Sequence, residues 1–384
     1  MAQIFCRHFT GYKPCGLNAV CDEKCPSFSR PSLHVLIVHL EALGAVLRAS
    51  SLLPAVHRKF PGCHVTWVTK APAHLFFSHQ KLVDRVVTTS HEDLQRLRAY
   101  HFDVGYVLDK SDLAASILDS VQVDIKYGFD FDGSAHAVVP HNSEAQDLWA
   151  LGLDNQSKFF ENKKPETQLL CEALDLPYTR EEYQITLTDE ERACVARRHR
   201  QWGGLNKTVV GVNTGCSPTI PYKKWSFTGL VDVVNKLSNH PQWQVVLLGG
   251  PEDRSRNHRV AGLFSGVINS PTERGLRDGL LSVAACDIVV TGDSLGMHMA
   301  IALRKWVVAW FGPTCAHEID LFGRGQAILT SAKCSPCWRR VCHKPTMCYD
   351  QLDFNAVYDA VLKGEAWHKD QLSSFKPPSS EICF

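Results

Sequence analysis

The sequence lacks any marked excess of charge of one sign. It has 41 lysines and arginines against 40 aspartates and glutamates among 384 residues. Nucleic-acid-binding domains usually carry a clear basic excess, so this balance argues against a nucleic-acid partner. An anionic ligand would therefore have to be bound by locally placed side chains.

Long apolar runs are also missing. The longest one near the start, residues 33–40, is less than half of the roughly 20 residues that a membrane-spanning helix needs, and it contains two histidines. No cleavable signal sequence precedes it. The hydrophobic share of 45% and the charged share of 21% are ordinary for globular proteins. We therefore expect a folded cytoplasmic protein.

The chain is too long for one typical core and suits two domains. From residue 33 onward, β-rich runs alternate with helical patterns, which is typical of parallel strands joined by crossover helices. A polar, helical stretch interrupts the alternation at about residues 161–200, and a second series follows. The strands that we expect are 33–40, 63–69, 85–89, 103–108 and 135–139, then 208–212, 244–248, 266–268, 287–291, 307–311 and 327–329.

Two such series predict an α/β fold of the GT-B type, in which two Rossmann-like domains face each other across a cleft. Ligands of these folds lie at the carboxyl ends of the strands, so residues that follow strands are the candidates for a site. The predicted parts are a Cys-rich segment at 1–30, an N-terminal domain at 31–203, a C-terminal domain at 204–350, and a final helix and tail at 351–384.

Small, polar or charged residues follow three strands of the second series. After residue 291 the chain turns through glycine into a helix, and the free N–H groups of a helix start suit diphosphate oxygens. The alternative is an ordinary capped helix, with Asp293 or Ser294 as its cap. The residues at the three strand ends are Asn213, Thr214 and Gly215, with Lys223 and Lys224 beyond them; Glu252; and Asp293, Ser294, Leu295, Gly296 and His298.

The order of these motifs resembles the donor domain of glycosyltransferase family 9, the ADP-heptose:lipopolysaccharide heptosyltransferases. The motifs are Asn-Thr-Gly-Cys, Lys-Lys-Trp, Gly-Gly-Pro-Glu, Asp-Ser-Leu-Gly-Met-His and Phe-Gly-Pro-Thr. The resemblance covers essentially residues 33–350 and is strongest over 208–348. It implies an acceptor-binding N-terminal domain and a donor-binding C-terminal domain.

The activity implied by the resemblance is inverting transfer of heptose, or a related sugar, from an ADP-activated donor. The acceptor would be a glycan or glycolipid such as the lipopolysaccharide inner core, with peripheral contact at the inner membrane. Two alternatives remain open. One is a GT-B transferase with another donor or acceptor, such as a protein or a secondary metabolite. The other is a catalytically silent protein that binds a nucleotide sugar or a metal.

The resemblance also assigns roles at the donor site. Lys223 would neutralise donor phosphate, which stabilises the charge that grows on the leaving diphosphate. Glu252 would lie near the ribose, and the residues from Asp293 to His298 would line the diphosphate and the sugar. No metal or other cofactor is then needed for catalysis. The alternative for Lys223 is an exposed lysine at a helix start.

The catalytic base is the point at which the sequence departs from the family. The family commonly has an aspartate in the first strand-to-helix turn, and Ala45 occupies that position here. Another carboxylate acts, or the reaction proceeds with less base assistance, or the protein is inactive. We favour Asp109, which follows a predicted strand and which Lys110 would keep ionised, with Glu41 as second choice. The alternative for Asp109 is a helix cap.

Three cations of the first half are candidates for binding an anionic acceptor. They are Arg48, Lys70 and Lys110. Each of them could equally be a solvated surface charge.

Fifteen cysteines are unusual for a cytoplasmic chain, where disulfides are rare and clustered cysteines more often bind metals. One cluster has a Cys-x2-Cys start typical of tetrahedral sites, and the family resemblance gives it partial support. The other lies before the first strand, where a short segment rich in glycine and proline needs a staple to be ordered. The predicted ligands of a structural zinc ion or [4Fe–4S] cluster are Cys334, Cys337, Cys342 and Cys348, and separately Cys6, Cys15, Cys21 and Cys25.

Overall fold

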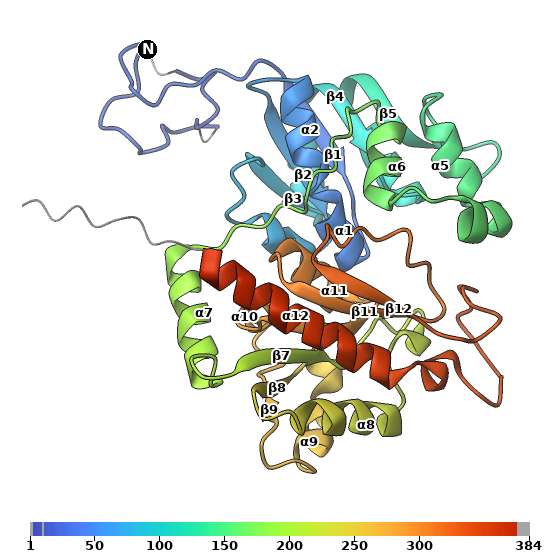
Figure 1. Cartoon of the computed structure of the whole chain (residues 1–384). Coiled ribbons are helices and arrows are strands. Elements are labelled where there is room, and N and C mark those ends of the chain that lie inside the picture. The colour runs from blue at the N-terminus through green and yellow to red at the C-terminus, as the bar shows by residue number, and fades with distance from the viewer. Residues whose placement is uncertain (1–2, 10, 375–384) are drawn as a thin grey trace, which may run out of the picture. The chain divides into compact units, whose positions relative to one another are not determined.

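The computed structural model describes residues 3–9 and 11–374 (Figure 1). The chain divides into two compact units, Met1–Thr186 and Leu187–Phe384. This boundary lies earlier than the predicted one at 203/204. Each unit contains one six-stranded sheet, whereas the alternating pattern predicted five strands for the first domain and six for the second.

The sheet of the first unit has the strand order β3-β2-β1-β4-β5-β6. Strands β1 to β5 pair in parallel, and β6 is antiparallel to β5. The chain adds strands outward from β1 to β3 and then returns to place β4 on the other side of β1. The strand order therefore reverses between β1 and β4. The strands are β1 (His34–Val38), β2 (His64–Thr69), β3 (Arg85–Thr88), β4 (His101–Val107), β5 (Gln122–Asp132) and β6 (Ala137–Pro140).

Strand β5 was not predicted from the sequence. Its residues alternate between charged and apolar side chains and are mostly exposed or half-buried, so no apolar run marks it. The helices of this unit cover the sheet and one another, with α4 on β4 and β5, and α6 beside α1, α2 and α5. They are α1 (Leu43–Ala49), α2 (Leu52–Lys59), η1 (Ala73–Phe77), α3 (His91–Leu97), α4 (Asp112–Asp119), α5 (Ala145–Leu151), η2 (Ser157–Glu161) and α6 (Glu166–Ala173).

The sheet of the second unit is entirely parallel and has the order β12-β11-β10-β7-β8-β9. All six of its strands were predicted. Their central members are buried along their whole length, as expected of strands covered on both faces. The strands are β7 (Thr208–Asn213), β8 (Trp243–Leu248), β9 (Ile268–Asn269), β10 (Ile288–Gly292), β11 (Trp306–Phe311) and β12 (Gly325–Leu329).

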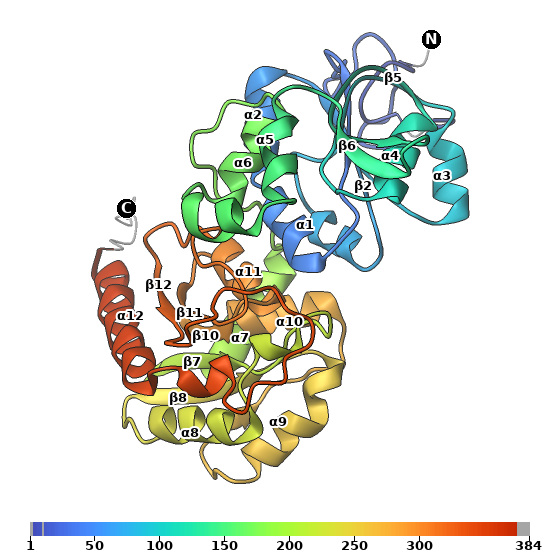
Figure 2. The same ribbon diagram turned by 90° about the vertical axis from the view of Figure 1, so that its right-hand side faces the viewer.

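Two groups of helices pack on this second sheet. Helix α12 contacts α8 and crosses β10, β11 and β12, as Figures 1 and 2 show, whereas α7, α10 and α11 follow one another in a separate series of contacts. Among the described residues, no helix is both long and apolar enough to span a membrane. The helices are α7 (Asp189–Gln201), η3 (Pro221–Lys223), α8 (Phe227–Ser238), η4 (Pro251–Asp253), α9 (Arg254–Ala261), α10 (Leu276–Ala284), α11 (Leu295–Ala302), η5 (Cys348–Gln351) and α12 (Phe354–Ser374).

Helix α7 belongs to the second unit, which explains why the boundary precedes it. Arg198 on α7 donates to Asp278 Oδ1 at 2.7 Å and to Ser282 Oγ at 2.7 Å. Arg277 on α10 pairs with Glu191 of α7 at 2.6 Å. Charge-assisted contacts of this kind fix the helix to α10, and a polar sequence pattern could not reveal which domain its charged side chains would pair with.

Asp287 provides a test of how the second unit is held together. Its Oδ2 accepts the Val209 N–H at 2.8 Å, and His199 Nε2 lies 3.2 Å from Oδ1. Burial acts to raise the pKa of this carboxyl, but the hydrogen bonds from His199 and Val209 outweigh it and hold the pKa below its usual range. A carboxylate with a lowered native pKa stabilises the fold above about pH 4, and this contribution is lost as the pH falls through the native pKa.

We expect Asp287→Asn to lower the free energy of unfolding by about 1.5–3 kcal/mol at pH 7, the usual range for hydrogen bonds to a charged group. The deficit should shrink as the pH falls from about 5 to 2 because the wild-type carboxylate is then protonated as well. Urea denaturation across this range measures both effects. Asp124→Asn is the control, since Asp124 makes a similar but exposed pair with His101. A deficit that stays constant with pH would contradict the assignment.

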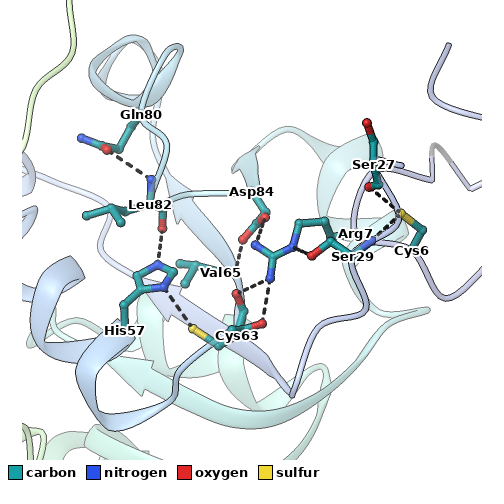
Figure 3. Close-up of polar contacts among 11 residues, drawn as sticks. Cys6, Arg7, Ser27, Ser29, His57, Cys63, Val65, Gln80, Leu82 and Asp84 are labelled. Atoms are coloured by element: carbon teal, nitrogen blue, oxygen red, sulfur yellow. Dashed lines mark hydrogen bonds and ion pairs between the residues drawn. The ribbon is translucent and has the colours of Figure 1, made fainter. Parts of the chain in front are cut away.

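The N-terminal segment is attached to the first unit by Arg7 (Figure 3). Its guanidinium donates to the Gly62 carbonyl at 2.7 Å and pairs with Asp84 at 3.2 Å, while its Nε donates to Ser29 Oγ at 3.1 Å. The described residues before β1 contain no helix or strand. Side-chain anchoring therefore replaces regular secondary structure in the predicted Cys-rich segment.

Candidate functional site

The strand ends of the second unit are tied together by Asn213. In the sheet of this unit the strand order reverses between β7 and β10, and open α/β sheets bind ligands at such a point. Asn213 ends β7, and its Nδ2 donates to Ser294 Oγ at 2.9 Å and to Thr291 Oγ1 at 3.2 Å, both at the end of β10. The side chain is buried, and Nδ2 also donates to the Gly215 carbonyl at 3.0 Å. Asn213 and Ser294 thus shape the floor of this edge.

Two glycines allow the close approach that this edge requires. A Cβ at Gly296 would stand 2.7 Å from Asn213 Cγ, and a Cβ at Gly292 would stand 2.0 Å from the Lys223 carbonyl oxygen. Any larger residue at Gly292 would push the η3 segment away from β10. The predicted Gly296 therefore acts through packing, and the loop that carries Lys223 rests directly on the strand end.

Three predicted donor residues converge on this edge. Lys223 Nζ lies 3.5 Å from Asp293 Oδ2, and His298 Nε2 lies 3.9 Å from Asp293 Oδ1. The Lys223 and Asp293 side chains are each only 16% exposed, so Lys223 is not the exposed lysine of the alternative reading. We call Lys223, Asp293 and His298 the charged cluster. It combines one ammonium group and one imidazole with one carboxylate at the N-terminal end of α11.

Trp225 fixes the segment that presents Lys223 and Lys224. Its side chain is 2% exposed, and its ring lies 5.3 Å from that of Trp310 on β11. Arg256 on α9 donates to the Trp225 carbonyl at 2.6 Å. In the Lys-Lys-Trp motif the tryptophan therefore packs in the core, and the two lysines lie half-buried at the edge of the sheet.

The N-cap residue of α11 does not cap the helix with its side chain. This residue is Ser294, but the hydroxyl makes no cap hydrogen bond and is engaged with Asn213 and Thr291. The alternative of an ordinary capped helix therefore does not hold for Ser294. Leu295 is half-buried in the first turn. A helix start whose N-cap side chain is engaged elsewhere has N–H groups that favour an anion, such as a phosphate.

The remaining predicted donor residues have different surroundings. The Thr214 hydroxyl is buried between the Leu248 carbonyl, at 3.0 Å, and Asn257 Oδ1, at 2.5 Å, so it contributes to packing. Gly215 faces Asp253, whose Oδ2 would lie 1.9 Å from a Cβ at that position. Glu252 is exposed on η4.

Asp253 was missed by the sequence analysis although it adjoins Glu252. It is 1% exposed, and its Oδ2 accepts the Gly250 N–H at 3.0 Å. Burial raises its pKa, with the Gly250 hydrogen bond opposing the shift. A sequence gives no sign of which member of a Glu-Asp pair faces inward, so only the fold identifies it.

The corresponding edge of the first unit holds Asp109 beside a histidine. The strand order reverses between β1 and β4, and His39 and Asp109 directly follow the ends of these two strands. His39 Nδ1 lies 2.7 Å from Asp109 Oδ1, and the Leu40 N–H donates to Asp109 Oδ2. The cap of α4 is Ser111, which accepts from Ala114, so Asp109 is not the helix cap of the alternative reading.

His39 is the second residue that the sequence analysis missed. The signal was present, since it is a histidine at the end of a buried strand, but pairing it with Asp109 required the strand order. The predicted partner of Asp109, Lys110, instead donates to the Leu148 carbonyl at 2.5 Å and lies 5.3 Å from the Phe129 ring.

The other candidates of the first unit are paired with one another or with neighbours. Lys70 Nζ lies 2.7 Å from Glu41 Oε1, and both side chains are exposed to a substantial degree. Arg48 is buried in α1, with Nη2 2.6 Å from Glu166 Oε1, so it is not a solvated surface charge. Ala45 lies half-buried on the same helix.

Each cysteine cluster lines one hollow. The C-terminal hollow has a volume of about 330 Å³, contains all four predicted cysteines, and is also lined by Lys333, Arg339 and Lys344. The N-terminal one has a volume of about 10 Å³ and is lined by Cys6, Cys15, Cys21 and Cys25. Yet within the described part of the chain, no three histidine, cysteine, aspartate or glutamate side chains stand close enough to hold a metal ion. The metal sites therefore stay predictions.

The comparisons with known proteins concern both sequence and fold. Residues 91–347 match the model of glycosyltransferase family 9 (heptosyltransferase). Lipopolysaccharide heptosyltransferase 2 of Salmonella typhimurium is 30% identical over 99 residues, which cover 24% of this chain and 28% of the relative. The matched stretch thus spans little more than a quarter of that relative.

Solved structures resemble nearly the whole chain. The family 9 glycosyltransferase of Veillonella parvula has a TM-score of 0.67 at 15% identity and covers 88% of this chain and 98% of its own. The E. coli ADP-heptose lipopolysaccharide heptosyltransferase II has a TM-score of 0.61 at 17% identity and covers 89% and 100%. These likenesses confirm the predicted GT-B class with two Rossmann-like units.

Proposed function

This chain belongs to glycosyltransferase family 9, and on that basis we propose that it transfers heptose, or a related sugar, from an ADP-activated donor to a glycan acceptor with inversion. The observation that carries the proposal is the charged cluster at the start of α11, where the N-cap residue Ser294 makes no cap hydrogen bond. A lysine beside a helix start is suited to a diphosphate.

In the proposed donor complex, the diphosphate lies at the first turn of α11 and Lys223 moves its ammonium from Asp293 to the phosphate oxygens. The positive charge stabilises the leaving diphosphate as the glycosidic bond breaks. Lys223 and the helix start supply this stabilisation without a divalent metal. Lys224 adds a second positive charge nearby, and Asp293 and His298 face the sugar. Glu252, exposed on η4, is our candidate for the ribose hydroxyls.

For the acceptor, we propose the carboxyl edge of the first sheet. Lys70 is the candidate cation with the greatest freedom to meet an anionic group, because its partner Glu41 is exposed. Arg48 is committed to Glu166 inside the unit, so we give it a supporting role. An acceptor of the lipopolysaccharide inner-core type, at the cytoplasmic face of the inner membrane, fits the ADP-heptose named for the E. coli structure.

One observation favours a second candidate function. Ala45 stands in the first turn, where the family resemblance implies an aspartate, and a methyl group cannot accept a proton. The second candidate is therefore a protein that binds a nucleotide sugar without transferring it.

Turnover separates the two candidates. The purified full chain is incubated with ADP-heptose, with and without a lipopolysaccharide core acceptor, and both ADP and the glycosylated product are measured. Acceptor-dependent release of ADP supports transfer. Tight binding of the donor with no release of ADP would support the silent protein instead.

We also propose that the two cysteine clusters bind a structural zinc ion or an iron–sulfur centre. The support is that four cysteines line one hollow in each case, and thiolates are preferred ligands of both kinds of centre. The sulfurs would have to move closer on binding.

Elemental analysis of protein purified without oxygen tests this proposal. We expect zinc or iron in the wild type, about half as much in Cys334→Ser/Cys337→Ser if both clusters bind, and no change in Cys286→Ser, since Cys286 is buried alone in the core. Wild-type protein free of both metals would contradict it.

A further inference from the structure

His39 and Asp109 form an enclosed pair at the point where the first sheet changes direction. Their side chains are 7% and 11% exposed, respectively, and the distance from Nδ1 to Oδ1 is 2.7 Å. Two other His–Asp pairs of the same unit, His101–Asp124 and His141–Asp130, lie on exposed surface. Of these three pairs, the enclosed one stands at the edge where a doubly wound sheet binds its ligand.

The two carboxylate oxygens of Asp109 are already engaged. Oδ2 accepts the Leu40 N–H, and Oδ1 faces His39. The two atoms are 2.7 Å apart but do not meet hydrogen-bond geometry in this structure, and catalytic hydrogen bonds often align only when substrate is bound. A carboxylate so committed is better placed to orient an imidazole than to take a proton from a substrate.

The imidazole has the complementary arrangement. Nδ1 is enclosed against Asp109, so the small exposed surface of the ring lies elsewhere on it. A carboxylate facing Nδ1 favours the tautomer with its proton on that nitrogen, which leaves a lone pair on Nε2. Among the other charged groups at this edge, Glu41 and Lys70 neutralise each other at 2.7 Å, and Lys110 donates to the Leu148 carbonyl.

We propose that His39 is the general base of this protein and that Asp109 is its positioning residue. Together they would replace the aspartate that the family resemblance implies at position 45. The proposal rests on the proposed function. His39 Nε2 takes the proton of the acceptor hydroxyl while that oxygen attacks the anomeric carbon. The bond from this carbon to the diphosphate breaks, and ADP leaves with the electron pair. Asp109 then balances the imidazolium charge.

Two conservative variants test the pair. His39→Asn keeps an amide near Asp109 but has no basic nitrogen, and Asp109→Asn keeps the shape but presents an NH2 group that can favour the wrong tautomer. We expect kcat to fall by about 10²–10⁴-fold in each, the usual contribution of a general base. ADP affinity and the thermal midpoint should stay at wild-type values. His141→Asn, which breaks an exposed pair of the same kind, is the control and should remain active.

Chemical rescue separates catalysis from a structural role. Added imidazole should restore part of the activity of His39→Ala, because it can enter the space and accept the proton, and should not restore Asp109→Asn. A fully active His39→Asn together with an inactive Asp109→Asn would make Asp109 itself the base and overturn the proposal. Full activity in both variants would also overturn it. A wild-type protein that transfers no sugar would reject the proposed function itself, whereas an active wild type with these variant results would reject only the assignment of His39.

Discussion

Lys223→Ala should lower kcat/KM for the nucleotide sugar by about 10²–10³-fold, the usual effect of removing one group that stabilises a developing negative charge. Lys223 lies at the carboxyl edge of the second sheet, 3.5 Å from Asp293 and next to the start of α11. Because the ammonium also attracts the ground-state diphosphate, ADP affinity should fall by about 10–100-fold, as expected for a charge-assisted hydrogen bond of about 1.5–3 kcal/mol.

Steady-state kinetics and calorimetry on the same preparations measure the two effects. Lys207→Ala is a matched control, since Lys207 is exposed and precedes β7 at the opposite edge of the sheet. Lys223→Arg keeps the charge and should retain part of the activity. Unchanged ADP affinity in Lys223→Ala would show that the donor site lies elsewhere.

Trp225→Ala should lower the free energy of unfolding by about 3–5 kcal/mol, the usual cost of removing a buried tryptophan. The ring is 2% exposed and packs on Trp310 within the core of the second unit. The same change releases the segment that carries Lys223 and Lys224, so ADP affinity should fall too. Unlike Lys223→Ala, this variant therefore loses stability and binding together.

Urea denaturation measures the loss of stability, with Trp225→Phe expected to recover a large part of it. Trp338→Ala serves as control because that tryptophan is exposed. If Trp225→Ala were as stable as the control, Trp225 would not be the anchor that we describe.

Much of the fold could be predicted because buried parallel strands have short apolar runs in their sequence. All six strands of the second unit were expected, since strands covered on both faces contain few polar residues. Strand β5 has charged residues at alternate positions and was missed. The domain boundary was placed too late because α7 is a polar helix, and only its contacts with Asp278 and Ser282 assign it to the second unit.

The candidate site could be predicted where its residues follow strands, and not where it depends on strand order. Lys223, Asp293 and His298 were expected together and lie together. The pairing of His39 with Asp109 could not be expected, because the two are far apart in the sequence and meet only when β4 lies beside β1.

The central claim is that the second unit binds an ADP-activated sugar, and calorimetric titration of the purified full chain with ADP, UDP, GDP and CDP tests it most directly. We predict that ADP binds and the other three nucleotides bind at least about tenfold more weakly, a difference of about 1.4 kcal/mol, and that the binding is weakened by Lys223→Ala. Absence of binding by all four nucleotides, or equal binding of all four that Lys223→Ala leaves unchanged, would contradict the claim.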